Sequence, residues 1–145
     1  MRVAALKNMT EPTHPSTDAL PTSASSNPNS ANALTALRDA LRRFAAERDW
    51  QQFHTPKNLA MALSVEAAEL LEPFQWLTAE QSAALDDATL ARVREEMADV
   101  LLYLIRLADR LDVDLLAAAC EKMVRNAQKY PVDKARGTSR KYTDL

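Results

Sequence analysis

Four acidic side chains form two short clusters, and the partners in each cluster are three residues apart. Glu66 and Glu69 stand in SVEAAELLE, and Glu96 and Asp99 stand in REEMADVLLYL. Both segments have the residue pattern of a helix, and one helical turn places such partners on the same face. Glu66 falls inside the apolar stripe of its helix, and Glu96 and Asp99 line one flank of the other stripe. The two acidic faces are therefore expected to meet.

Carboxylates gathered in this way require a compensating positive charge, because removing an ionised carboxylate from water costs several kcal/mol. Oxygen ligands without a nearby Cys or His suit a hard cation that keeps some of its waters. The clusters therefore predict a site for Mg²⁺, with Mn²⁺ as a possible substitute. The alternative interpretation is that all four acids are ordinary solvated charges on helix surfaces.

The composition indicates a single all-α domain. The chain has 145 residues, a net charge of -2, one glycine and seven prolines, and it lacks stretches of β-branched alternation. The small net charge gives no support for binding to nucleic acid. The longest apolar run is interrupted by Tyr103 and Arg106 and is too short to span a bilayer. We expect an oligomeric four-helix bundle without a membrane segment.

Each of the four main helices begins at a residue whose side chain can cap the first turn. The starts are Ser30, Thr55 before Pro56, Asp86 or Asp87, and Asp112 or Asp114, and the first, second and last helices are expected to extend to about residues 48, 72 and 130. Thr78 and Gln81 form a capping box for a short additional helix that ends near residue 85.

Three regions follow from this organisation: residues 1–30 as a flexible tail, residues 31–131 as the helical domain, and residues 132–145 as a basic arm. The tail lacks the apolar core of a signal peptide. Cys120 has no internal disulfide partner and lies in the apolar run LLAAAC, so a buried thiol and a cytoplasmic location are expected. Leu101, Leu102 and Ile105 make the third helix apolar on most sides, which indicates a subunit interface.

The motifs occur in a specific order from about Leu34 to the C-terminus. ERDWQQFHTPKNL comes first, then the two acidic clusters followed by LLEPFQW and VLLYL, then KMVRNAQKYP and SRKYTDL. This series resembles the MazG-like all-α nucleoside triphosphate pyrophosphohydrolases, most closely their dCTP pyrophosphatase branch. The resemblance implies Mg²⁺-dependent cleavage between the α and β phosphates, which releases a monophosphate and pyrophosphate.

The resemblance also assigns site residues. It implies that the four acids are the catalytic metal ligands and that the protein is a homotetramer built as a dimer of dimers. The substrate, a nucleoside triphosphate, would be held by two groups of residues: Tyr103, Lys122 and Asn126 at the phosphate oxygens, and Trp50, His54 and Trp76 around the base. One departure is Val65, where many relatives carry a second adjacent glutamate. Glu72 or Glu95 could orient the attacking water.

Each assignment has a plainer alternative. Lys122 and Asn126 can form a solvated basic face, Tyr103 can be a core residue, and His54 can be a structural residue or a helix cap. At the level of the whole protein, the alternative is a non-catalytic helical module whose apolar third helix binds a partner. A di-iron bundle is disfavoured because neither acidic cluster contains the ExxH motif of that class.

Overall fold

The computed structural model describes residues 30–144, and this part of the chain consists of helices and their connections, without a strand. The all-α class predicted from composition is confirmed. The predicted tail falls almost wholly outside the described residues, and the three-region division stays a prediction. The helices are α1 (Ser30–Glu47), η2 (Trp50–Gln52), α2 (Pro56–Leu71), α3 (Ala79–Ser82), α4 (Asp87–Arg110), α5 (Leu115–Lys129), α6 (Val132–Ala135) and η3 (Tyr142–Asp144).

Side-chain caps set the beginnings of the helices, as the sequence predicts. The Thr55 hydroxyl accepts a hydrogen bond from the third residue of α2, and Pro56 occupies the first helical position. Thr78 and Gln81 form the reciprocal capping box of α3. Asp86 caps α4 and Asp114 caps α5. For α1, the position before Ser30 lies outside the described residues.

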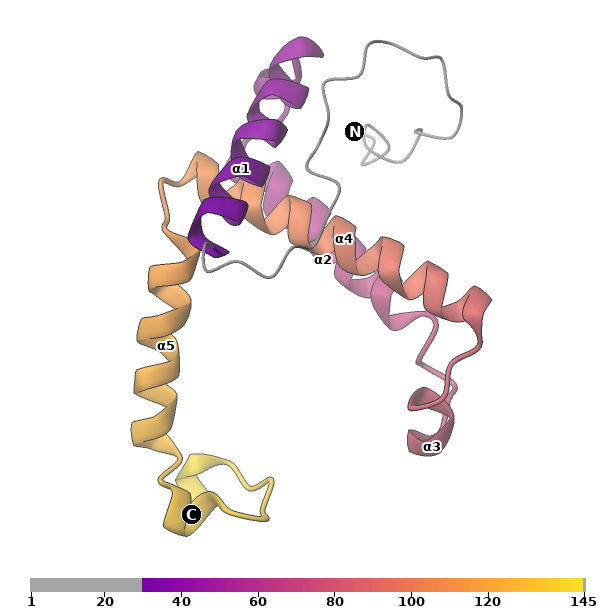
Figure 1. The fold of residues 1–145 in the computed structure, drawn as a ribbon, viewed down its shortest axis with the longest axis vertical. Coiled ribbons are helices and arrows are strands. Elements are labelled where there is room, and N and C mark those ends of the chain that lie inside the picture. Colours follow the sequence, from indigo (N-terminus) through magenta and orange to yellow (C-terminus); the bar gives the residue numbers. More distant parts are fainter. Residues whose placement is uncertain (1–29, 145) are drawn as a thin grey trace.

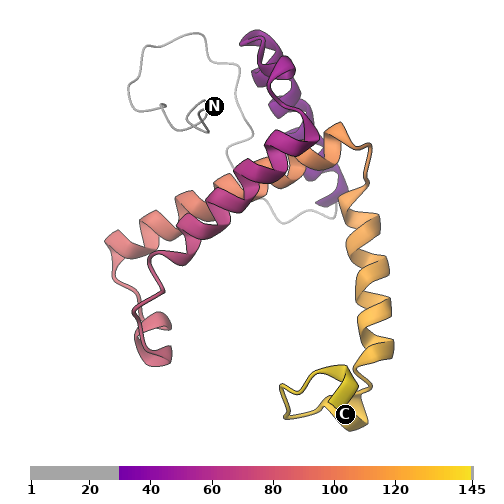
Figure 2. The same ribbon diagram turned by 180° about the vertical axis from the view of Figure 1, so that it is seen from behind.

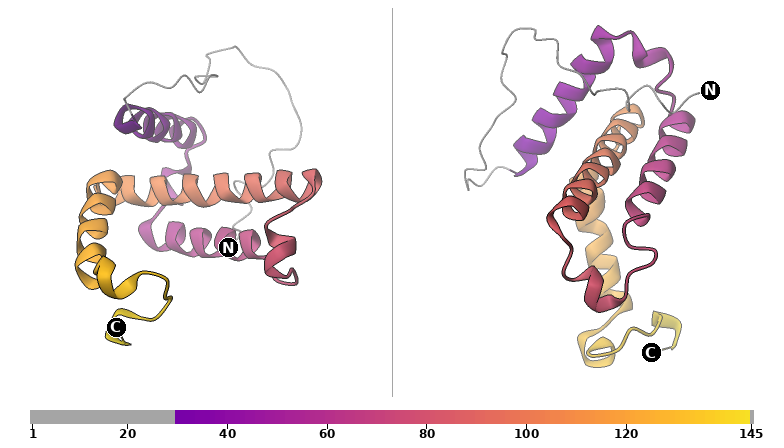
Figure 3. Two further views of the ribbon diagram at one scale, coloured as in Figure 1. Left: turned by 60° about the horizontal axis from the view of Figure 1, so that its bottom comes forward. Right: turned by 90° about the vertical axis from the view of Figure 1, so that its right-hand side faces the viewer.

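The best-packed part of the chain is the antiparallel pair of α2 and α4, which are connected by the segment that contains α3 (Figure 1 and Figure 3). Leu59 and Ala62 of α2 and Tyr103 of α4 form its buried cluster, and Leu63 and Leu107 pack against them. Tyr103 is therefore a core residue on the seam between the two helices. Burial of these side chains is the main force that fixes α2 against α4.

The other two long helices diverge from this pair. α1 lies across α4 and contributes Ala45, which is 1% exposed. α5 leaves the end of α4 and extends away from α2, as seen from both sides in Figure 1 and Figure 2. No residue of α5 is buried. Cys120 is exposed on it, so the expectation of a buried thiol is wrong for the single chain, because none of the described helices covers this part of α5.

The C-terminal segment is short and partly ordered by aromatic contacts. It contains α6 and η3, and the rings of Tyr130 and Tyr142 meet edge to face with centroids 6.0 Å apart. The Lys129 amine lies 5.0 Å from the centre of the Tyr142 ring. These contacts return the arm to the end of α5 (Figure 1). None of the described helices combines the length and apolar character needed to cross a membrane.

Candidate active site

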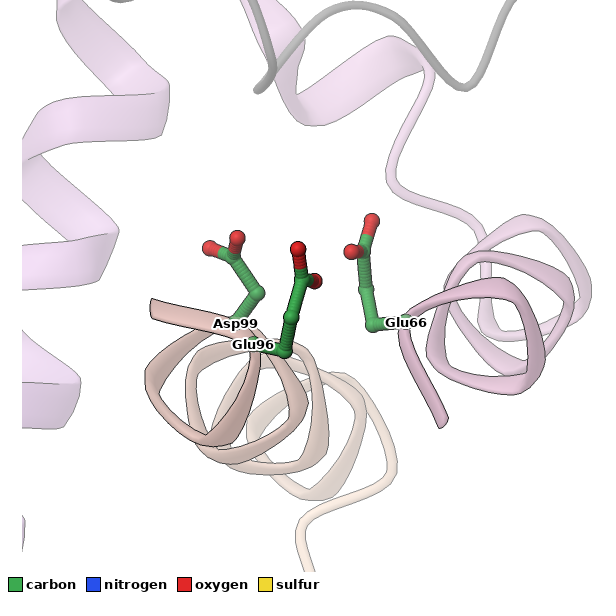
Figure 4. A group of neighbouring side chains, drawn as sticks. All are labelled: Glu66, Glu96 and Asp99. Atoms are coloured by element: carbon green, nitrogen blue, oxygen red, sulfur yellow. The ribbon is translucent and has the colours of Figure 1, made fainter. Parts of the chain in front are cut away.

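Three of the four predicted acids converge on one point between α2 and α4. Glu66 comes from α2, and Glu96 and Asp99 come from successive turns of α4 (Figure 4). One carboxylate oxygen of each residue lies within 4.8 Å of the other two. Glu66 is 1% exposed, whereas Glu96 and Asp99 are half-buried. The predicted meeting of the two acidic faces is therefore observed.

Glu69 does not belong to this group of three. It lies one turn after Glu66 on α2 and is half-buried. Its carboxylate is outside the set of oxygens that approach one another within 4.8 Å. Glu69 therefore stays a predicted ligand.

The electrostatics of the acidic group favour a divalent cation. Three carboxylates in one partly buried place repel one another, and that repulsion is screened weakly away from water. Oε2 of Glu96 is fully buried and has no hydrogen-bond partner among the described residues. A buried acceptor of this kind is costly unless a cation or a donor satisfies it. An all-carboxylate set of oxygens fits a hard ion such as Mg²⁺ or Mn²⁺.

Tyr103 lies beside these acids as well as in the core. Its side chain is 5% exposed. Burial, assisted by the negative charges of Glu66 and Asp99, raises the pKa of Tyr103 to about 12. The phenol is therefore neutral at physiological pH and can donate a hydrogen bond to an anion. This chemistry is compatible with both the core interpretation and the predicted phosphate contact.

A small cavity lies between Asp99, one of the acids, and His54, one of the predicted base-binding residues. Asp99 and Tyr103 line one part of it, and His54 and Arg106 line another. Its volume is about 20 Å³, which is enough for about one water molecule. A nucleobase would therefore lie at its mouth or move its walls apart. The remaining walls are apolar and consist of Leu41, Phe44, Ala45, Leu59 and Leu102.

The chain is similar to a known protein family and to individual proteins of known activity. Residues 61–145 match the model of the MazG-like family. The chain belongs to that family. It is 46% identical to the dCTP pyrophosphatase 1 of Rattus norvegicus over 128 residues, which are 85% of this chain and 75% of that protein. It is also 46% identical to the Homo sapiens dCTP pyrophosphatase 1 over 77% of this chain and 67% of that protein.

A solved structure supports the same assignment. A pyrophosphatase from Archaeoglobus fulgidus matches with 42% sequence identity and a TM-score of 0.65, over 68% of this chain and 92% of that chain. The MazG-like assignment predicted from the ordered motifs is confirmed by the family match and the curated relatives, and the solved structure agrees in fold with a pyrophosphatase.

Only some of the predicted base-binding residues come together in this MazG-like chain. Trp50 contacts His54 with ring centroids 6.0 Å apart, and Phe44 meets Trp50 edge to face at 5.7 Å. Trp76 follows α2 and is 86% exposed, which is unusual for a large aromatic side chain. It does not line the cavity that His54 lines. Trp50 does not line that cavity either.

The two predicted phosphate-binding residues of the last helix are also separated from the acids. Lys122 and Asn126 are exposed and lie in the part of the MazG-like chain where α5 extends away from α2 and α4 (Figure 2). Nothing on α5 belongs to the acidic group or lines the cavity. Within one chain these two residues and the acidic group are therefore separate.

Two sets of residues around the cavity are not predicted from the sequence. Leu102 is predicted only as part of a subunit interface and Phe44 is assigned to no site, although both line it. Arg106 is predicted from the sequence only as an interruption of an apolar run. In the structure it is buried and donates a hydrogen bond to His54. A signal existed: an arginine inside an otherwise apolar helix, with Asp109 one turn later, indicates a buried ion pair.

Proposed function

We propose that the protein is a Mg²⁺-dependent nucleoside triphosphate pyrophosphohydrolase that converts dCTP, or a modified dCTP, to the monophosphate and pyrophosphate. The observation that carries this proposal is the convergence of Glu66, Glu96 and Asp99 in a chain 46% identical to dCTP pyrophosphatase 1. Such an activity removes unwanted nucleotides from the cellular pool, and we place it in the cytoplasm.

The three converging acids, together with Glu69, are the proposed ligands. When bound, Mg²⁺ would neutralise the triphosphate charge, ease deprotonation of the attacking water and stabilise the leaving pyrophosphate. The fit rests on the all-oxygen donor set and on the buried Oε2 of Glu96, for which residues 30–144 provide no hydrogen-bond partner. Without a cation, the same carboxylates would repel the triphosphate.

The chain's own groups would position the substrate. The neutral Tyr103 hydroxyl, one turn after Asp99, is suited to donate to a phosphate oxygen beside the acids. A carboxylate in hydrogen-bond reach of the water would take its proton. Glu72 and Glu95 are both exposed, and Oε2 of Glu72 lies 3.8 Å from a guanidinium nitrogen of Arg92. They remain the two candidates for this base.

A homo-oligomer would complete the site. α5 has no buried residue in the single chain, although it carries exposed apolar side chains such as Leu116, Met123 and Val124. Exposed apolar surface of this kind marks a protein contact. We propose a tetramer, formed as a dimer of dimers, in which α5 of a second copy brings Lys122 and Asn126 to the triphosphate.

The test of the function is a product assay across the four dNTPs with Mg²⁺. We expect pyrophosphate and the matching monophosphate, with dCTP or a 5-modified dCTP preferred. Orthophosphate with a diphosphate product would contradict attack at the α phosphorus. Glu96→Gln should lose the activity, whereas Glu47→Gln, which changes an exposed acid of α1, should keep it.

A further inference from the structure

A buried polar network borders the cavity on the side of His54. Nε of Arg106 donates to Nδ1 of His54 over 3.2 Å, and a terminal nitrogen of Arg106 donates to Oδ2 of Asp109 over 2.6 Å. Nε of Arg42 donates to the other carboxylate oxygen of Asp109 over 2.7 Å. The side chains of Arg106 and Asp109 are 7% and 4% exposed. The network therefore joins α1, α4 and the connection before α2.

The direction of these hydrogen bonds fixes the state of the imidazole. A guanidinium always carries its protons and can only donate, so Nδ1 of His54 must be the acceptor. The ring is then neutral and its single proton is on Nε2. Burial, and then the charges of Arg106 and Arg110, lower the pKa of His54, which agrees with a neutral ring.

Asp109 holds Arg106 in place for this role. A guanidinium buried without a counter-ion would be strongly destabilising, and Asp109 supplies the opposite charge one turn further along α4. Arg42 occupies the second oxygen of Asp109, so that carboxylate cannot turn away from Arg106 without losing a bond. The guanidinium of Arg106 is thus held by two hydrogen bonds, one to His54 and one to Asp109.

We infer that Arg106 is a positioning residue that holds His54 as an Nε2–H donor at the cavity, where it donates a hydrogen bond to an acceptor atom of the nucleobase. A pyrimidine such as cytosine has such acceptors in its ring nitrogen and its carbonyl oxygen. Among the described residues no hydrogen bond uses Nε2 of His54, which leaves this donor for a ligand. This inference rests on the proposed function, because it assigns the base to the cavity that Asp99 also lines.

The alternative is that the network serves only to attach α1 and the connection to α4. A structural role and a positioning role both predict that loss of Arg106 lowers stability. They differ in two respects. Only a positioning role makes the proton position on His54 depend on Arg106, and only a positioning role makes the effect of Arg106 on selectivity disappear when His54 is replaced.

The first experiment measures the tautomer of His54 by ¹⁵N NMR of the imidazole in the full-length wild-type protein. The chain has two histidines, and the variant His14→Gln leaves the signal of His54 alone. We expect a neutral ring protonated on Nε2 at pH 7.5, and a mixture of tautomers in Arg106→Gln. Protonation of the wild-type ring on Nδ1 would overturn the inference independently of any enzymatic activity. The same proton position on His54 in the variant as in the wild type would also overturn it.

The second experiment is a double-mutant cycle on substrate selectivity. The readout is the ratio of kcat/KM for dCTP to kcat/KM for a deoxyribose triphosphate that lacks the base. Arg106→Gln should lower this ratio about tenfold, mainly through KM, because one oriented hydrogen bond is worth about 1.4 kcal/mol. His54→Gln should partly retain the ratio, because its amide can donate from nearly the position of Nε2.

The decisive comparison is Arg106→Gln in the His54→Ala background. Arg106→Gln should change the ratio less than twofold there, and a full tenfold effect would show a merely structural role. Arg106→Lys, which keeps a charge for Asp109 but lacks Nε, should fold more stably than Arg106→Gln and share its loss of selectivity. Turnover of the base-free substrate reports on the proposed function separately. If the wild type hydrolyses neither this substrate nor dCTP, the pyrophosphohydrolase assignment is wrong. The NMR experiment still decides the tautomer of His54 in that case.

Discussion

Glu66 on α2 and Glu96 on α4 face each other across the seam of the two helices, with carboxylate oxygens within 4.8 Å of one another. The same seam contains Leu59, Ala62 and Tyr103, so the apolar core directly supports the acidic group. Packing thus holds like charges together that would otherwise separate. This conflict between packing and charge is a common property of metal and catalytic sites.

Neutralising one acid should stabilise the protein without metal and remove its response to metal. Glu96→Gln reduces the repulsion toward Glu66 and Asp99, so without divalent ions we expect unfolding to become harder by roughly 1–2 kcal/mol. The wild type should gain thermal stability with Mg²⁺, and the variant should not. The measurement is Tm with EDTA and with Mg²⁺. Equal gains in both proteins would contradict a shared cation site.

Tyr103→Phe should separate the two roles of this side chain. The ring fills the core between α2 and α4, and phenylalanine retains that packing, so Tm should change by only a few degrees. Loss of the hydroxyl should lower kcat/KM about tenfold if it contacts a phosphate oxygen. Steady-state kinetics with dCTP decide the point, and unchanged kinetics would leave Tyr103 as a core residue alone.

The conformational stability should fall as the pH is lowered below the ordinary pKa of histidine. The pKa of His54 is lowered from 6.5 in the folded chain, because of burial and the nearby arginines. Below about 6.5 the unfolded chain therefore binds a proton that the folded chain does not, which favours unfolding. In EDTA, denaturant titrations from pH 7.5 to 5.5 should show this loss in the wild type and a smaller one in His54→Gln. His14→Gln is the matched control and should behave as the wild type.

A charge on the exposed apolar face of α5 should disrupt both assembly and activity. Met123 is 71% exposed in the single chain, and Met123→Glu should weaken a contact made by that face. We expect smaller particles by light scattering and a reduced kcat/KM, because Lys122 and Asn126 would no longer reach a neighbouring site. Gln128→Glu introduces the same charge elsewhere on α5 as a control. A monomeric wild type with full activity would contradict the proposed assembly.

Local signals in the sequence predicted the elements well. Thr55 with Pro56, the capping box of Thr78, and Asp86 all begin helices as expected, because caps depend on residues within one turn. The convergence of Glu66 with Glu96 and Asp99 was also predictable, since both acidic clusters border the apolar faces that pack together. These features depend on spacing alone.

Features that depend on distant packing were not predictable. Cys120 is exposed because no helix within residues 30–144 covers α5, and no local pattern specifies where a helix points after its cap. Trp50 precedes α2 and Trp76 follows it, so whether the two rings meet depends on the packing of distant segments and not on a local pattern. The bond from Arg106 to His54 joins residues far apart in sequence, so the pairing could be known only from the structure.

The most direct test of the metal site is a crystal of the protein grown with Mn²⁺ and a non-hydrolysable dCTP analogue, with data collected at the manganese absorption edge. We predict an anomalous peak between the carboxylates of Glu66, Glu96 and Asp99, and its absence in Glu96→Gln. A wild-type crystal with the analogue bound but no anomalous density at these three side chains would contradict the account.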